Sequence, residues 1–216
     1  MRPLALFPGD GPKRLLLLGA HADDIEIGCG GTVLRLVAEH PGLEVTWVVL
    51  TSNPARADEA RTSAAGFLGE SARSTIIVKE FRDGFLPWSG VAVKDAFEAL
   101  KSVVSPDLIL THYREDRHQD HRLVSDLTWN TWRNHLILEY EIPKFDGDFG
   151  SPQVFVPLPS ATVERKVDLL MHAFPSQAGR GWFTRDLFRS VARIRGMECA
   201  APDGLAEAFY CRKAVV

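Results

Sequence analysis

Short apolar runs alternate with helix-like segments along most of this chain, and that alternation restricts the fold more than any other sequence feature. The runs at 14–20 and 43–51 are rich in Leu and Val, as expected of buried strands. Ala and Glu recur at helical spacing over 55–68, directly after the start signal Asn53-Pro54. Alternating strands and helices are typical of a mostly parallel sheet with helices on both faces. We therefore expect an α/β fold of that kind.

The rest of the chain continues the alternation. We expect further strands at 75–78, 108–111, 136–142, 153–156 and 208–212, and helices at 32–39, 94–104, 122–133, 162–174 and 186–195. Gly28-Cys29-Gly30-Gly31 is expected to turn the backbone tightly before the first helix. No repeat or linker divides the 216 residues, so a single domain over 1–216 is expected, with segment 143–152 as a surface loop near the functional site.

Composition argues against several classes of protein. A net charge of −3 and a pI near 6.2 give no reason to expect binding to nucleic acid or to an anionic membrane. No run approaches the roughly 18 apolar residues of a membrane span. The three cysteines are Cys29, Cys199 and Cys211, an odd and sparse set that favours a reducing, cytoplasmic location over a disulfide framework. The sequence leaves the oligomeric state open, a homo-oligomer included.

Two clusters of metal-binding residue types each follow one of the apolar strands. The first is His21-Ala22-Asp23-Asp24, after the strand at 14–20, and the second is Asp116-Arg117-His118-Gln119-Asp120-His121, after the strand at 108–111. In one parallel sheet the two strands end at a shared edge, where open α/β sheets bind ligands. Two imidazoles and a carboxylate meeting there would form a three-ligand metal site with an open position for water, as in catalytic zinc centres.

The first cluster contains one more carboxylate than a shared ion needs. His21 and Asp24 can reach one ion from a tight turn, which leaves Asp23 free to act as a base for a water molecule. The alternative is that Asp23 and Asp24 are solvated turn residues that cap the following helix.

The second cluster offers two histidines three positions apart. One of His118 and His121 can bind the metal, while the other stands off it, protonated, to stabilise an oxyanion and supply a proton to a leaving amine. Asp116 or Asp120 can orient that imidazole. The alternative is a charged surface loop. His112, at the end of the preceding strand, is expected to be structural or to support the site.

Together the two clusters resemble the motifs of the PIG-L/LmbE-like zinc-dependent de-N-acetylases. The resemblance rests on His-x-Asp-Asp followed by Gly-Cys-Gly-Gly-Thr, and on the later His-x-Asp-His. Weaker agreement extends through Arg56-Ala57-Asp58-Glu59, Asp83-Gly84 and Ala206-Glu207-Ala208-Phe209, whereas Ala22 stands where the family commonly has proline. Enzymes of this family remove acetyl groups from N-acetylglucosamine-type conjugates, including precursors of mycothiol, bacillithiol and glycosylphosphatidylinositol.

The resemblance implies a Rossmann-like fold and a role for each residue of the clusters. It implies that His21, Asp24 and His121 bind Zn²⁺, that Asp23 is the general base and that His118 is the electrophilic, proton-donating histidine. Either Asp23 or His118 would protonate the leaving amine. Fe²⁺ or another divalent ion is the alternative to zinc in a His₂Asp site.

The resemblance also implies substrate contacts outside the clusters. Arg56 and Asp83 match positions that the family places near the sugar. The alternative for Arg56 is an ordinary arginine on a helix surface.

The leading function is therefore a hydrolase for a small-molecule N-acetyl sugar conjugate. Two alternatives are an amidase for a non-sugar N-acyl group and a non-catalytic, Rossmann-like protein that binds a nucleotide or another ligand. Gly28-x-Gly30 hints at a dinucleotide site but lacks the full spacing of that motif. These glycines more simply allow a helix and a strand to pack closely.

Overall fold

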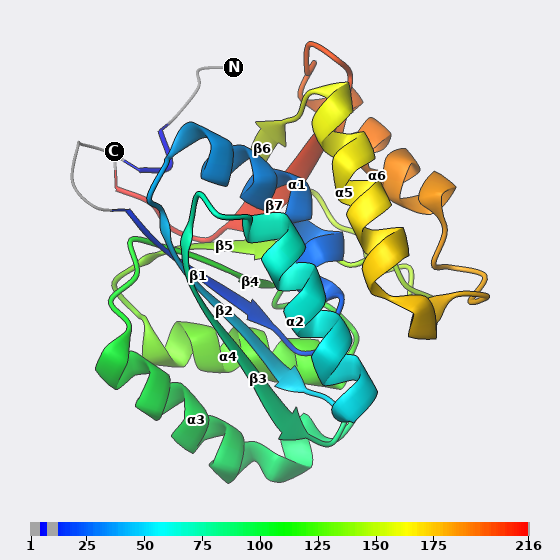
Figure 1. The fold of residues 1–216 in the computed structure, drawn as a ribbon. Coiled ribbons are helices and arrows are strands. Elements are labelled where there is room, and N and C mark those ends of the chain that lie inside the picture. The colour runs from blue at the N-terminus through cyan, green and yellow to red at the C-terminus, as the bar shows by residue number, and fades with distance from the viewer. Residues whose placement is uncertain (1–4, 8–12, 216) are drawn as a thin grey trace.

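Seven strands form one sheet in this computed structural model, which describes residues 5–7 and 13–215. The strand order is β3-β2-β1-β4-β5-β7-β6 (Figure 1). The strands are β1 (Arg14–Gly19), β2 (Glu44–Thr51), β3 (Arg73–Phe81), β4 (Leu108–His112), β5 (Leu136–Tyr140), β6 (Val154–Pro157) and β7 (Ala206–Cys211). β7 runs antiparallel to β5 and β6, and the remaining pairs are parallel. The domain expected over 1–216 includes residues 1–4, 8–12 and 216, which lie outside the described residues.

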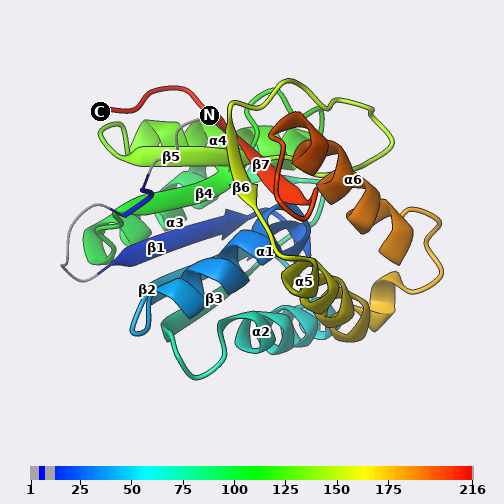
Figure 2. The same ribbon diagram turned by 90° about the horizontal axis from the view of Figure 1, so that it is seen from above.

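Helices cover both faces of this sheet. They are α1 (Asp24–Glu39), α2 (Pro54–Leu68), α3 (Gly90–Val103), α4 (Gln119–Thr131), α5 (Ser160–Ala173) and α6 (Arg185–Glu198), with short 3₁₀ turns η1 (Leu86–Ser89) and η2 (Pro175–Gln177). Figure 2 shows α1, α2 and α5 on one side of the sheet and α3 and α4 on the other. The expected α/β fold, a mostly parallel sheet with helices on both faces, is confirmed.

The leucine run of β1 is buried on both sides of the sheet. Leu15 and Leu17 pack into the core beneath α1, α2 and α5, whereas Leu16 and Leu18 pack into the core beneath α3 and α4. This division follows from the strand period of two, which sends successive side chains to opposite faces. A strand covered on both faces needs apolar residues at every position, which explains the unbroken run.

β1 and β4 are direct neighbours, and the strand order reverses between them. Leu15, Leu16 and Leu17 pair in parallel with residues 108–110. From β1 the chain proceeds through α1 to β2 on one side, and it later returns through α3 to β4 on the other side. Ligands of open α/β sheets bind at such a reversal, beyond the carboxyl ends of the strands. The two polar clusters leave the sheet at this point.

The start of α1 differs from the sequence-based expectation. The helix begins at Asp24 and includes residues 28–31, so the predicted tight turn and the predicted helix start at 32 are wrong. A Cβ atom on Gly28 would lie 2.2 Å from the Tyr140 ring, and one on Gly30 would lie 2.6 Å from Phe67. These glycines therefore allow close packing of the helix, as expected. Because the segment is helical, it does not form the phosphate-binding turn of a dinucleotide site.

The other elements lie within a few residues of their predicted ranges. β3 is longer than predicted, and α4 begins at Gln119 rather than at 122. The Asn53 side chain caps α2 by accepting the backbone N–H of Arg56, as the start signal predicted. Within the described residues, no helix combines the length and apolar character that crossing a membrane requires. The cytoplasmic location and the oligomeric state stay predictions.

Candidate metal centre

Three side chains from the two clusters converge at the switch point between β1 and β4. His21 Nδ1 lies 3.2 Å from Asp24 Oδ2 and 3.1 Å from His121 Nε2, and the last two atoms are 3.5 Å apart. Tetrahedral zinc bound at about 2.0–2.2 Å would separate neighbouring ligand atoms by about 3.3–3.6 Å. The spacing and chemistry of this donor set therefore fit a divalent ion with two imidazole ligands and one carboxylate ligand.

Both histidines of this set have a carboxylate behind the ring. His121 Nδ1 lies 2.9 Å from Asp116 Oδ2, and His21 Nε2 lies 3.3 Å from Asp120 Oδ2. A carboxylate at one ring nitrogen holds the proton there and leaves the lone pair of the other nitrogen available. The two nitrogens that would bind an ion, Nδ1 of His21 and Nε2 of His121, are those that face Asp24.

The electrostatics of the site favour a positive charge at its centre. Burial opposes ionisation of His21, but the Asp24 and Asp120 carboxylates outweigh it and raise the pKa of His21 well above its ordinary value. Burial also opposes ionisation of Asp24, yet the surrounding histidines hold its pKa well below the ordinary value. Burial, reinforced by His112, lowers the pKa of His121 to about 3, so this imidazole is neutral, the form that binds metals.

Asp23 lies beside the donor set and is held by an arginine. The Asp23 and Asp24 side chains are buried and Asp23 makes no capping hydrogen bond, so the alternative of solvated capping residues is wrong. Asp23 Oδ1 lies 3.0 Å from Arg56 Nη2. Burial raises the pKa of Asp23 and Arg56 opposes that rise. A carboxylate whose pKa is displaced toward neutrality accepts a proton from water more readily than an exposed one.

The Arg56 side chain is held in place by residues of α2 and η2. Its Nη1 donates to Glu59 Oε2 at 2.8 Å and to Ser176 Oγ at 3.0 Å. Its side chain is 17% exposed, so the alternative of an ordinary helix-surface arginine is wrong. The contact with Ser176 ties α2 to the segment after α5, next to the aspartate pair.

His118 is the N-cap residue of α4, and its ring packs against the candidate ligand His21. Its Nδ1 accepts the backbone N–H of Asp120 at 3.2 Å, and its ring meets the ring of His21 edge-on with centroids 4.8 Å apart. Burial, followed by the charge on His21, lowers the pKa of His118. This geometry favours a neutral ring that donates from Nε2, in place of the protonated ring that the sequence led us to expect.

Asp83 reaches the site from the loop after β3. Its carboxylate is largely exposed and lies 3.1 Å from His21 Nε2. Asp120 tethers the same loop, because its two oxygens accept the backbone N–H groups of Gly84 and Leu86 at 2.8 and 3.1 Å. The expected substrate residue Asp83 is therefore at the solvent side of the candidate metal ligands.

Asp116 connects the site to the loop at 143–152. Besides its contact with His121, it accepts a hydrogen bond from Lys144 Nζ at 2.8 Å, and Lys144 also pairs with Asp148. The loop therefore lies near the site, as expected. Because Asp116, Asp120 and His121 are buried, the alternative of a charged surface loop is wrong for these three residues.

His112 contributes more to the centre than the sequence indicated. Its Nε2 lies 3.2 Å from Asp24 Oδ2, and its ring stacks on His121 with centroids 4.0 Å apart. Asp24, His112 and His121 thus form a second group of donor atoms within 4.8 Å of one another. His112 Nε2 already accepts the backbone N–H of Ala20 at 2.9 Å, which makes His21 the better third ligand. The one sequence signal was its position at the carboxyl end of an apolar strand.

The chain belongs to the PIG-L family. The family model described as PIG-L, GlcNAc-PI de-N-acetylase, matches residues 16–132, more than half of the chain and both clusters. An uncharacterized deacetylase of Escherichia coli K12, YaiS, is 31% identical over 158 residues, which cover 66% of this chain and 80% of that protein. Both findings confirm the resemblance to de-N-acetylases that the motifs indicated.

Solved structures support the fold. The N,N'-diacetylchitobiose deacetylase from Pyrococcus horikoshii is 22% identical with a TM-score of 0.72, covering 92% of this chain and 83% of that one. GalB, the 4-carboxy-2-hydroxymuconate hydratase from Pseudomonas putida KT2440, is 16% identical with a TM-score of 0.72, covering 94% and 98%. Because a deacetylase and a hydratase both match, the fold alone does not specify the reaction.

Proposed function

We propose that this protein is a metal-dependent N-deacetylase that hydrolyses the acetamide of an N-acetylglucosamine-type sugar or sugar conjugate to a free amine and acetate. The observation that carries the proposal is the convergence of donor atoms from His21, Asp24 and His121 within 3.1–3.5 Å of one another. Membership of the PIG-L family supports the choice of an acetamide over other carbonyl substrates.

The three converging residues would hold Zn²⁺, with Fe²⁺ or another divalent ion as the alternative. When bound, such an ion supplies Lewis-acid polarisation of a carbonyl and lowers the pKa of a bound water. Asp116 and Asp120 would fix the orientation of the two histidine rings through the contacts described above.

Asp23 and His118 would then perform the proton transfer and the charge stabilisation. Asp23, oriented by Arg56, accepts a proton from the attacking water. His118 donates a hydrogen bond from Nε2 to the acetamide oxygen, which becomes the tetrahedral oxyanion. Because Nδ1 of His118 is occupied by a backbone N–H, the proton for the leaving amine comes from Asp23.

Arg56 and Asp83 would contact the sugar. The exposed carboxylate of Asp83 can accept hydrogen bonds from hydroxyl groups within reach of the ion, since it lies 3.1 Å from His21. Arg56 lies at the site through its contact with Asp23. The deacetylase from Pyrococcus horikoshii acts, by its name, on an N-acetylated chitobiose, which supports a glucosamine-type substrate here.

Elemental analysis and acetate release test the proposal. The purified protein should contain one divalent ion, and metal removal with a chelator should abolish acetate release from N-acetylglucosamine conjugates. His121→Ala should lose the metal, whereas Asp23→Asn should keep it and lose turnover. A metal-loaded Asp23→Asn variant with full activity would exclude Asp23 as the base.

Adding N-acetyl amino acids and a nucleotide-binding assay to these measurements separates the alternatives. Acetate release from N-acetyl amino acids but from none of the sugars would favour the non-sugar amidase. A protein that binds a nucleotide, contains no metal and releases no acetate would favour the non-catalytic binding protein.

A further inference from the structure

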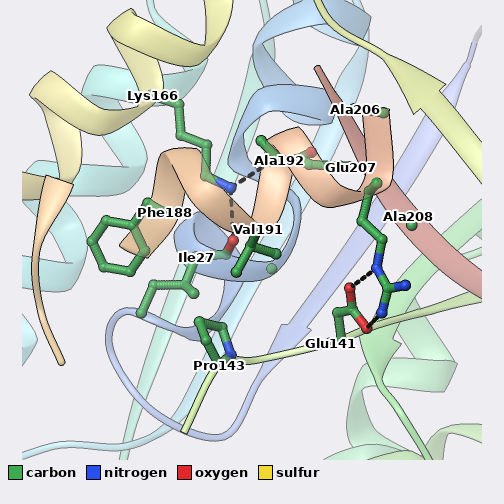
Figure 3. Close-up of a pocket in the computed structure, with 12 residues that line it drawn as sticks. Ile27, Glu141, Pro143, Lys166, Phe188, Val191, Ala192, Ala206, Glu207 and Ala208 are labelled. Atoms are coloured by element: carbon green, nitrogen blue, oxygen red, sulfur yellow. Dashed lines mark hydrogen bonds and ion pairs between the residues drawn. The ribbon is translucent and has the colours of Figure 1, made fainter. Parts of the chain in front are cut away.

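A buried ion pair contacts the N-terminal half of α1, the helix that begins at the candidate ligand Asp24. Lys166 of α5 and Glu207 of β7 are each 6% exposed, and Lys166 Nζ lies 2.6 Å from Glu207 Oε1. Figure 3 shows the lysine ammonium group between Ile27 and Glu207 at the edge of a small cavity. The cavity has a volume of about 20 Å³, enough for about one water molecule and far too little for a sugar. The pair therefore acts on the protein rather than on a ligand in this cavity.

Both charged groups are hydrogen-bonded to the backbone of α1. Lys166 Nζ donates to the Ile27 carbonyl at 2.7 Å. The two oxygens of Glu207 accept the backbone N–H groups of Gly31 and Thr32 at 2.8 and 2.6 Å. Two side chains from different elements thus hold one helix at three backbone groups, which span little more than one turn.

This contact lies one helical turn from the proposed base. The Ile27 N–H donates to the Asp23 carbonyl at 3.0 Å, while the Ile27 carbonyl accepts from Lys166. One residue, Ile27, therefore connects the ammonium group to the backbone of Asp23 through its carbonyl and its N–H. A shift of α1 along its axis would move Asp23 and the ligand Asp24 together.

The local packing is built around this pair. A Cβ atom on Gly31 would lie 2.5 Å from Leu158 and 3.0 Å from Glu207 Oε1, so glycine is required for the carboxylate to approach the helix. Burying two ions costs several kcal/mol per ion, and apolar residues of similar volume often serve stability equally well. Stability alone is thus a weak reason for an ion pair here.

We propose that Lys166 and Glu207 are positioning residues, which set the axial position of α1 and thereby place Asp23 and Asp24 relative to His21 and His121. This inference rests on the proposed function, because it concerns the same metal centre. A ligand set tolerates displacements of about 0.5 Å before metal affinity and catalysis suffer. Loss of the contact to α1 should therefore weaken both at once.

A second ion pair in the same region provides a matched control. Arg195 and Glu141 are also buried, and their two hydrogen bonds are both 2.7 Å long. Both line the same cavity, in which Figure 3 labels Glu141. Within residues 5–7 and 13–215, the hydrogen bonds of this pair go to Glu198, Gly150 and Tyr210, and none goes to α1.

The test compares Lys166→Met with Arg195→Met at a temperature at which both are folded by circular dichroism. Zinc affinity is measured by competition with a chromophoric chelator, and kcat and KM are measured by acetate release. Lys166→Met should lose at least about tenfold in zinc affinity and in kcat, with KM unchanged. Arg195→Met should lower the melting temperature but leave zinc affinity and kcat unchanged.

Three outcomes would overturn the inference. One is a folded Lys166→Met variant with the zinc affinity and kcat of the wild type. Another is an Arg195→Met variant that loses as much zinc affinity as Lys166→Met, because the effect would then follow stability. If Lys166→Met does not fold, Glu207→Gln takes its place in the comparison. The third outcome would be a Glu207→Gln variant with the zinc affinity and kcat of the wild type. Failure of the proposed function is distinguishable, since the wild-type protein itself would then bind no zinc or release no acetate.

Discussion

The Asp23 carboxylate and the Arg56 guanidinium lie 3.0 Å apart, and this contact joins the N-terminus of α1 to α2. Asp23 is next to the proposed ligand Asp24 in the chain, but its carboxylate contacts the arginine instead of the histidines. The two neighbouring carboxylates can therefore have different roles. Arg56 is in turn fixed by Glu59 and Ser176. The proposed base is therefore held in one orientation by a side chain that is itself immobilised.

Replacing Arg56 should impair the reaction without emptying the metal site. In Arg56→Met the Asp23 carboxylate loses its partner and its fixed direction, and a misplaced catalytic group can cost about 100-fold in rate. We expect kcat to fall by roughly that factor, with zinc content unchanged. Arg61→Met on the same helix is the control, because Arg61 is exposed and lies 4.0 Å from its nearest acidic partner. Loss of zinc from Arg56→Met, or full activity, would contradict this prediction.

The sequence predicted the fold and the meeting of the two clusters because both depend on local patterns. Apolar runs identify β1 and β4, and each cluster begins within a few residues of its strand. The neighbouring position of these two strands could not be read from the sequence, since strand order depends on contacts between distant segments. What could be expected was a shared sheet edge, and the structure places the strands side by side.

The errors arose where a residue is determined by its tertiary neighbours. Glycine favours turns, so residues 28–31 were expected to turn, whereas the Tyr140 and Phe67 rings occupy the space that side chains on this helix would need. His112 and Lys166 stand alone in the sequence, without a partner at helical or strand spacing. Their roles depend on Asp24 and Glu207, which are far away in the chain.

Removal of the carboxylate behind His121 should weaken metal binding. Asp116 Oδ2 lies 2.9 Å from His121 Nδ1, and in Asp116→Asn the amide can no longer hold the imidazole proton as a carboxylate does. Loss of such a partner typically lowers metal affinity 10- to 100-fold. Chelator competition should show that decrease. Asp126→Asn, an exposed change on α4, should bind zinc like the wild type; equal affinities for all three proteins would rule out an orienting role for Asp116.

Adding one methyl group to Gly28 should destabilise the fold. The new Cβ atom would lie 2.2 Å from the buried Tyr140 ring, whose hydroxyl donates to the Leu18 carbonyl at 2.7 Å. Overpacking of this kind costs about 1–3 kcal/mol, and the better helix propensity of alanine returns at most about 1 kcal/mol. Urea denaturation should therefore show a lower free energy of unfolding for Gly28→Ala.

Gly90→Ala is the control for that substitution. Gly90 is the first residue of α3, and a Cβ atom built on it would meet no side chain or distant backbone within 4 Å in the part of the chain that the structure describes. Its free energy of unfolding should be unchanged or up to about 1 kcal/mol higher. A Gly28→Ala variant as stable as Gly90→Ala would show that the Tyr140 ring can move aside without cost.

Glu139 should make stability depend on pH. Its side chain is fully buried, accepting the Arg114 backbone N–H at 2.9 Å and the Trp129 indole N–H at 2.5 Å. Burial raises the pKa of Glu139 above its ordinary value of 4.5, so the folded state binds this proton more tightly than the unfolded state. The stabilisation is complete below the unfolded pKa and is lost as pH rises through the folded pKa.

Comparison with Glu139→Gln isolates this contribution, because glutamine does not titrate. The free energy of unfolding of the wild type, relative to the variant, should be greatest near pH 4 and should decline toward pH 7. Urea denaturation at several pH values measures the difference, and the exposed change Glu80→Gln should leave the pH dependence of the wild type unaltered. A difference that grows with pH would mean that the Arg114 and Trp129 hydrogen bonds outweigh burial and stabilise the ionised carboxylate.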